Sequence, residues 1–284
     1  FGLPFETKGS FIEALEWLMQ HKIDNLAAHQ LFLLKGMELY RKSEREKFGL
    51  KTMFRPVSCF YGIIDGEFVC ENEEVVVSSN DFSFDDFMTV RKISLLFYLV
   101  NACGYFKKAI NFLIDEHHSI VPLFEKMMNP EPLHKDFAGI VKDFVQMAKS
   151  ELFQTHFELS RKLKSDFRDN GNEVLRPARL NVFFSSQFIY GKKCFGEVLK
   201  SLIDIGGDKQ IILNDLINIS ENEWADIKNP ESGKTLIVSA ETLKYLKLSI
   251  ENGYKTYHYK MLPSSDQVLK LIKYNEQYKK DEDS

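Results

Sequence analysis

The chain has 284 residues, of which 44% are hydrophobic and 13% aromatic, so it can bury one substantial core or two smaller ones. Its net charge of -4 supplies no broad positive field, and we therefore expect no nucleic-acid partner. The most apolar run, residues 93–106, is shorter than the ~20 residues needed to cross a bilayer. We expect a buried helix there, no membrane partner and, without a visible secretory signal, a cytoplasmic protein.

The cysteines argue against a disulfide framework, because Cys59, Cys70, Cys103 and Cys194 are far apart in a chain with an ample core. No three of them have the Cys-x-x-x-Cys-x-x-Cys spacing that brings thiolates together on an iron–sulfur cluster. Cys59 and Cys70 could approach each other across a hairpin, but two thiols do not complete a zinc site. We interpret all of them as thiols and predict no metal site in this chain.

A helix followed by a strand is predicted at the start of the chain. Residues 10–21 have an apolar stripe at helical spacing, and Ser10 with Glu13 can form a capping box. The nearly continuous apolar run over 26–34 is typical of a strand covered on both faces in a parallel sheet, and Lys35-Gly36 ends it. This order of elements is the repeating unit of a β/α barrel.

An antiparallel hairpin is predicted next, because Asp65-Gly66 separates two apolar segments. Glu71, Glu73 and Glu74 precede a run of valines and could serve as acid/base carboxylates. We favour a solvated strand edge that discourages further pairing. Ser83-x-x-Asp86 then predicts the start of the helix that continues into residues 93–106.

Beyond residue 115 the pattern becomes mainly helical. Helices are predicted around 123–127 and 137–148, separated by Pro130 and Pro132, and over 193–205. Short strands are predicted at 235–239 and 254–261, with a last helix from Pro263. The fold class is therefore α+β and predominantly helical.

Several separated segments resemble one family in the correct order. Residues 2–7, Gly-Leu-Pro-Phe-Glu-Thr, resemble the Gly-Leu-Pro-Gly-Glu-Thr turn of the radical S-adenosylmethionine (SAM) barrel, with Phe5 in place of the second glycine. Residues 34–39, Leu-Lys-Gly-Met-Glu-Leu, resemble the Leu-Pro-Gly-Thr-Glu-Leu turn of its cobalamin-binding members, with Lys35 and Met37 as departures. Residues 45–55, 61–66 and 82–91 resemble the segment that follows the barrel, so the resemblance covers residues 1–115.

The resemblance implies the C-terminal part of a cobalamin-binding radical SAM enzyme, truncated at its N-terminus. Residues 1–50 would be the end of the β/α barrel, 51–115 a post-barrel hairpin and long helix, and 116–284 a helical C-terminal domain. The full-length protein would bind a [4Fe-4S] cluster, SAM and cobalamin, with the cluster ligands upstream of Phe1. Its partners would be the upstream barrel and cobalamin domain of the same polypeptide and a small-molecule substrate.

The family's chemistry implies cleavage of SAM to a 5'-deoxyadenosyl radical and, in cobalamin-binding members, methyl transfer to a poor nucleophile. By motif match, the residues that would bind SAM are Gly2, Leu3, Pro4 and Glu6 at the turn, and Gln30, Leu33 and Leu34 at the end of the next strand. The carboxylate of Glu6 could instead stabilise the start of the following helix.

No catalytic residue is assigned in this chain, which lacks the cluster motif and would be inactive alone. The alternative is a non-catalytic α-helical scaffold or interaction domain, because core packing fully explains the aromatic-rich helices of 116–284.

Overall fold

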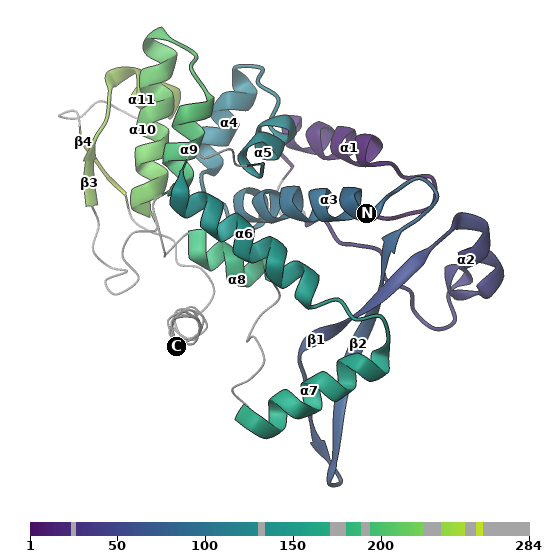
Figure 1. Cartoon of the computed structure of the whole chain (residues 1–284). Helices are drawn as coiled ribbons and strands as arrows, with labels where there is room; N and C mark the ends of the chain where they lie inside the picture. The colour runs from purple at the N-terminus through teal and green to yellow at the C-terminus, as the bar shows by residue number, and fades with distance from the viewer. Residues whose placement is uncertain are drawn as a thin grey trace.

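The computed structural model describes residues 1–23, 27–129, 134–170, 180–188, 194–223, 234–247 and 254–257. A helical body carries a long two-stranded ribbon that projects from it (Figure 1). The helices are α1 (Lys8–Gln20), η1 (Glu38–Tyr40), α2 (Lys42–Phe48), α3 (Phe84–Phe97), the π-helix η2 (Tyr98–Ala102), α4 (Lys107–Asp115), α5 (Val121–Met127), α6 (Lys135–Ser150), α7 (His156–Asn170), α8 (Leu180–Ser186), α9 (Cys194–Leu202), α10 (Gly207–Glu223) and α11 (Ala240–Tyr245). The strands are β1 (Lys51–Ile64), β2 (Glu67–Ser78), β3 (Lys234–Ile237) and β4 (Tyr254–Tyr257). The α+β, predominantly helical class is confirmed.

Helix α1 begins earlier than predicted. Thr7 is the N-cap, and its hydroxyl accepts a hydrogen bond from the Ser10 backbone at 3.1 Å. The Ser10 hydroxyl in turn accepts from the Thr7 backbone at 3.0 Å. The predicted capping box of Ser10 with Glu13 is therefore wrong, because Ser10 occupies the third helical position of a box that starts at Thr7.

The segment that precedes α1 pairs with the segment that follows it. The Phe1 nitrogen donates to the His29 carbonyl at 2.6 Å, and the Leu31 nitrogen donates to the Phe1 carbonyl at 2.7 Å. A residue that bonds in this way to both neighbours of one partner residue has the pattern of a parallel pair. The residues that flank α1 therefore lie side by side at Phe1, and the segment after α1 is not one of the named strands.

The predicted strand over 26–34 is wrong in extent and in pairing. Residues 24–26 lie outside the described residues, and the hydrogen bonds that pair the following segment with neighbouring segments involve residues 29–33. On its second edge this segment pairs antiparallel with β2, through Leu33 to Glu74 at 2.8 Å and Val76 to Leu31 at 2.9 Å. Because β2 occupies that edge, the segment is not the middle of a parallel sheet.

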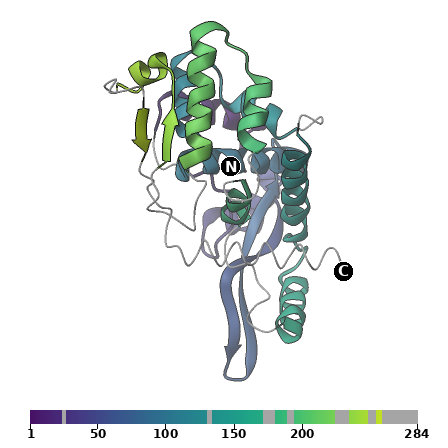
Figure 2. The ribbon, with the colours of Figure 1, turned by 90° about the vertical axis from the view of Figure 1, so that its left-hand side faces the viewer.

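The hairpin predicted at Asp65-Gly66 is confirmed and is longer than the sequence indicated. Both turn residues have positive φ, 51° and 81°, as a type I′ turn requires. The pairing of β1 with β2 runs from Lys51↔Ser78 to Ile64↔Glu67, with a shift between Pro56 and Tyr61. The outer half of this ribbon extends beyond the body, with α7 beside it (Figure 2). Phe167 of α7 packs on Tyr61 and Phe68, with ring centroids 6.1 and 5.4 Å apart.

Helix α3 is the central buried helix of the body. Its predicted start is confirmed, since the Ser83 hydroxyl accepts from the Asp86 backbone at 3.1 Å and the Asp86 carboxylate accepts from the Ser83 backbone at 3.0 Å. The predicted helix over 93–106 is buried, but it changes to a π-helix at Tyr98 and is interrupted before α4, where Phe106 has a φ of 57°.

One hydrophobic core connects the predicted segments 1–50, 51–115 and 116–284. It extends from Phe1 to Leu243 and includes buried aromatic side chains from α3, α4, α6, α8 and α9. The helices predicted around 123–127, 137–148 and 193–205 are confirmed as α5, α6 and α9. The predictions for Pro130, Pro132 and the last helix fall outside the described residues.

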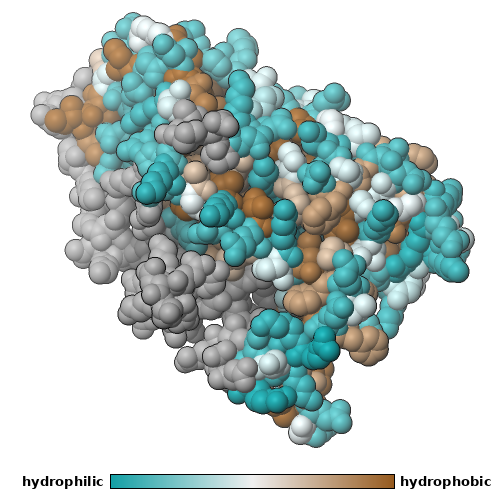
Figure 3. Space-filling view, viewed as in Figure 1, coloured by the Kyte–Doolittle hydropathy of each residue, from teal (hydrophilic) through white to brown (hydrophobic). Residues whose placement is uncertain are grey.

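The surface of the body seen in Figure 3 carries both apolar and hydrophilic side chains. Apolar side chains gather near the middle of the face seen in Figure 3, within a mostly hydrophilic surround. On the ribbon, Phe60, Ile63, Ile64 and Val69 are exposed. In the part of the chain that the structure describes, no helix has both the length and the apolar character needed to cross a bilayer.

Candidate functional site

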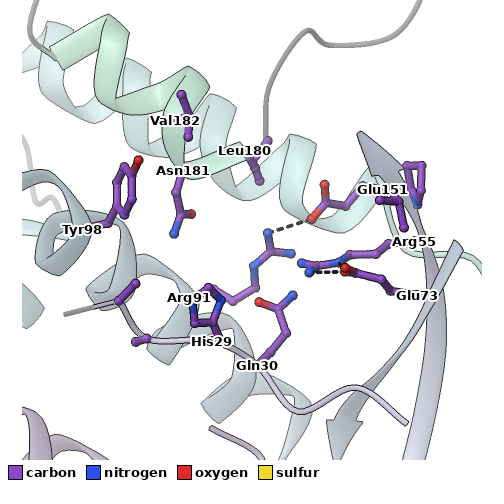
Figure 4. Close-up of a pocket in the computed structure, with 14 residues that line it drawn as sticks. His29, Gln30, Arg55, Glu73, Arg91, Tyr98, Glu151, Leu180, Asn181 and Val182 are labelled. Atoms are coloured by element: carbon purple, nitrogen blue, oxygen red, sulfur yellow. Dashed lines mark hydrogen bonds and ion pairs between the residues drawn. The ribbon is translucent and has the colours of Figure 1, made fainter. Parts of the chain in front are cut away.

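A cavity of about 100 Å³ lies where residues 27–30, the ribbon, α3 and α8 meet. Figure 4 shows its polar side chains, which come from elements far apart in the sequence. The polar lining consists of His29, Gln30, Arg55, Glu73, Arg91, Tyr98, Glu151 and Asn181. The cavity therefore combines two Arg–Glu pairs with neutral hydrogen-bonding groups.

The first pair is formed across the ribbon. Arg55 on β1 lies directly opposite Glu73 on β2. The Nε and Nη2 atoms of Arg55 both donate to Glu73 Oε2, the former at 2.7 Å, and each side chain is only 16% exposed. The predicted solvated edge is therefore wrong at Glu73.

The prediction is also wrong at Glu74, whose carboxylate accepts hydrogen bonds from Arg45 and Thr52. Burial raises the pKa of Glu74, but these hydrogen bonds outweigh it and hold the pKa below its ordinary value. Both carboxylates are thus structural partners of cations or hydroxyls, because β2 is paired on both edges at this level.

The second pair is more deeply buried. Arg91 on α3 is 4% exposed and Glu151, at the end of α6, is 8% exposed. Arg91 Nη2 donates to Glu151 Oε1 at 2.7 Å, and Nη1 donates to the Ala148 carbonyl at 3.2 Å. The guanidinium also lies 5.8 and 5.9 Å from the ring centres of Phe87 and Phe144. This pair fixes α3 to the end of α6.

Tyr98 lies seven residues after Arg91 and therefore on the same face of the helix. It begins the π-helix, and π-turns occur frequently at functional sites. Burial raises the pKa of Tyr98 to about 12, and burial raises that of the adjacent Cys103 thiol to about 11. Both groups are protonated at neutral pH, so Tyr98 offers the cavity a hydroxyl and Cys103 is no thiolate nucleophile.

Gln30 is the predicted SAM-binding residue that lines this cavity. Its Nε2 atom is buried, and among the described residues it has no hydrogen-bond partner. In Figure 4 the amide faces the guanidinium groups of Arg55 and Arg91. An unsatisfied buried donor beside an open volume identifies a place where an acceptor atom fits.

The residues predicted at the first turn lie elsewhere. Glu6 Oε2 accepts from the backbone nitrogens of Gly2 at 2.6 Å and Leu3 at 3.3 Å, and the Glu6 nitrogen donates to the Leu3 carbonyl at 3.1 Å. Glu6 thus closes its own turn around Pro4. The capping hydrogen bonds of α1 come from Thr7 and Ser10, so the alternative that Glu6 stabilises the start of this helix stays a prediction about the charge of its carboxylate.

Leu33 and Leu34, which were also predicted to bind SAM, lie in different environments. Leu33 is 4% exposed and packs with Leu50 and Val76 in a small second core. Leu34 is 54% exposed, and Leu3 at the turn is 50% exposed. The seven predicted residues therefore occupy the cavity, a closed turn, a core and the surface, rather than one site.

Phe5 has a φ of 65°, in the left-handed region that favours glycine. This is the position at which the family's turn carries its second glycine. We expect Phe5→Gly to exceed Phe5→Ala in free energy of unfolding by about 1 kcal/mol, because both lose the ring but only glycine relieves the backbone strain. Chemical denaturation of the two variants measures the difference.

Leu3 in the same turn provides the control, since its φ is not positive. There the order should reverse, with Leu3→Gly less stable than Leu3→Ala by roughly 0.5–1 kcal/mol. Equal stabilities for the two Phe5 variants would contradict the left-handed conformation.

The described residues provide no cluster site. None of their His, Cys, Asp and Glu side chains form a group of three or more that could hold a metal ion. Cys70, Cys103 and Cys194 are free thiols. Residues of this chain therefore do not fit a [4Fe-4S] cluster within the described ranges.

The sequence alone missed Arg55, Arg91, Tyr98, Glu151 and Asn181 as cavity residues. One usable signal was Arg91, a charge next to the most apolar run of the chain. Charged residues are almost never fully buried without a partner, so this position pointed to a paired or functional group. Comparison with protein-family models and with curated proteins gave no match to this chain.

Proposed function

We propose that this chain forms the late β/α units and the helical cover of a cobalamin-binding radical SAM enzyme that acts on a small molecule. The observation that carries the proposal is the parallel pairing of Phe1 with residues 29–31 through α1. Two segments that pair in parallel across a helix, next to a Gly-Leu-Pro turn, support the family resemblance, because parallel neighbours joined by a helix are the repeating unit of the barrel.

The conformation of the turn supports the same proposal. Phe5 has the positive φ that a glycine would adopt in the family's pattern, and Glu6 holds the turn through the nitrogens of Gly2 and Leu3. The conformation of the turn therefore supports the resemblance, although Phe5 differs from the family's pattern.

The proposal assigns the cofactors to different parts of the polypeptide. The cluster, which when reduced supplies the electron for cleavage of SAM, requires thiolates outside the described residues of this chain. Gln30 and the cavity beside it could hold part of SAM, since the amide has a buried donor without a partner. The Gly2–Glu6 turn and Leu34 lie apart from this cavity and receive no assigned role in it, and we assign no residue to cobalamin.

The helical body would limit the access of water to the barrel. Helices α3 and α8 and the end of α6 contribute side chains to the cavity lining, and the same helices carry fully buried rings in the core, among them Phe87, Phe144 and Phe183. Exclusion of water protects a reactive intermediate from side reactions. Methyl transfer is the reaction class that the resemblance favours.

The test uses the full-length polypeptide that contains this sequence, purified without oxygen. We expect bound iron and cobalt, and conversion of SAM to 5'-deoxyadenosine on reduction. A preparation from which iron has been removed serves as the control and should be inactive. A folded full-length protein with no cluster and no SAM cleavage would overturn the proposal and favour the non-catalytic scaffold.

A further inference from the structure

We propose that the cavity beside Gln30 is a binding site for the carboxylate of a short aliphatic acid. The inference does not depend on radical chemistry, because it rests on described residues of this chain that line the cavity. The proposed carboxylate binds between the side chains of Gln30, Arg55 and Arg91.

Hydrogen-bond donors converge on the cavity. Figure 4 shows the guanidinium groups of Arg55 and Arg91 and the amide of Gln30 pointing toward one another. Gln30 Nε2 is buried and has no partner among the described residues, and in Figure 4 its amide faces the guanidinium groups of Arg55 and Arg91, which are themselves donors. Leaving such a donor unsatisfied costs ~1–3 kcal/mol. An acceptor placed between the three groups removes that cost.

A carboxylate matches this arrangement better than a single carbonyl. It is planar and offers two oxygens with several lone pairs, which suit the forked donors of guanidinium groups. Hydrogen bonds to a charged acceptor are roughly twice as strong as neutral ones. The Gln30 amide can donate to one oxygen while a guanidinium donates to the other.

The charges of the lining favour one negative charge over two. Glu73 and Glu151 already neutralise Arg55 and Arg91, so the four groups sum to zero. A monoanion adds one negative charge, which the converging donors can stabilise. A phosphate dianion would add two beside the existing carboxylates, and like charges at short range are unfavourable.

The rest of the lining is apolar and small. Ala27, Pro56, Val57, Leu180 and Val182 border the cavity, whose volume of about 100 Å³ holds only a few heavy atoms. Ligand pockets commonly combine such apolar walls with a few placed polar groups. The chain of the acid would lie against these side chains, with the Tyr98 hydroxyl and Asn181 at its edge.

The first experiment titrates the whole chain, free of iron and SAM, with propionate, propionamide and inorganic phosphate, using calorimetry. We expect saturable binding of propionate and at least tenfold weaker binding of the neutral amide and of phosphate. Gln30→Leu should weaken propionate about tenfold, as loss of one charge-assisted hydrogen bond implies. Equal binding of propionate and propionamide, or no saturable binding of propionate, would overturn the proposal.

A second variant distinguishes an anion site from a structural charge cluster. Gln30→Glu places a carboxylate of the protein among the same donors, so we expect a higher melting temperature than the unmodified chain and no propionate binding. If the field of Glu73 and Glu151 dominated instead, the new carboxylate would be repelled and the variant would melt at a lower temperature. That outcome would refute the site even if Gln30→Leu failed to fold.

Discussion

Replacement of Glu151 with leucine is expected to lower the free energy of unfolding by about 3–5 kcal/mol, because it leaves the Arg91 guanidinium buried without its carboxylate. Arg91 is 4% exposed, and its Nη1 also donates to the Ala148 carbonyl at 3.2 Å. A carbonyl dipole cannot compensate a full charge at that depth. Urea denaturation followed by circular dichroism measures the loss.

The double variant Arg91→Leu with Glu151→Leu should recover much of that stability, since removing both charges also removes their desolvation cost. Glu46→Leu is the matched control, because Glu46 and its partner Lys42 are 68% and 89% exposed and such pairs contribute less than about 1 kcal/mol. If Glu151→Leu were as mild as Glu46→Leu, the buried position of the pair would be wrong.

The second large effect is expected at Phe195, whose replacement with alanine should cost about 3–5 kcal/mol. The ring is fully buried on α9 and lies 4.7 Å from that of Phe106 and 5.7 Å from that of Tyr105. It also lies 6.3 and 6.2 Å from Phe137 and Phe188, so one side chain on α9 joins the start of α4, α6 and the residues that follow α8. The cavity left by the missing ring cannot collapse when four elements border it.

Phe157→Ala is the comparison, since that ring is 73% exposed and the change should alter stability by less than about 0.5 kcal/mol. Thermal and chemical denaturation of both variants should agree. A Phe195 variant as stable as the Phe157 variant would show that the aromatic cluster does not hold these helices together.

Local signals in the sequence predicted the parts of the fold that depend on neighbouring residues. Asp65-Gly66 specified its turn because only the backbone conformation of those two residues was needed. Ser83 and Asp86 specified a helix start because each satisfies a backbone donor of the other.

Long-range pairing was not predictable in the same way. The apolar run over 26–34 predicted burial on both faces, but among residues 27–34 only Leu33 is buried. Periodicity also does not say which strand lies alongside. A remote carboxylate was equally hidden: Glu16 on α1 accepts from the backbone nitrogens of Ile120 and Val121, at 2.6–3.0 Å, and so caps α5. Nothing in the sequence near α5 indicates that partner.

The candidate site likewise combines residues that the sequence indicated with residues that only long-range packing brings together. Gln30 followed from the family resemblance, whereas Arg91 and Glu151, 60 residues apart in sequence, meet only after α3 packs against α6. Arg55 and Glu73 could be paired once the hairpin register was known, since they lie directly opposite each other. The solvated edge predicted at Glu73 and Glu74 was wrong, although an acidic run is typical of such an edge. The cations that pair with these two carboxylates come from β1 and α2.

The ion pair of Arg91 and Glu151 connects α3 to the end of α6, and both side chains also line the cavity. A molecule that occupies the cavity would therefore bind the native state and not the unfolded chain, so occupancy and folding become thermodynamically linked. At a ligand concentration one hundred times its Kd, that linkage adds about 2.7 kcal/mol to the folding equilibrium. The supply of the acid would then govern resistance to proteolytic turnover as well as the occupancy of the cavity.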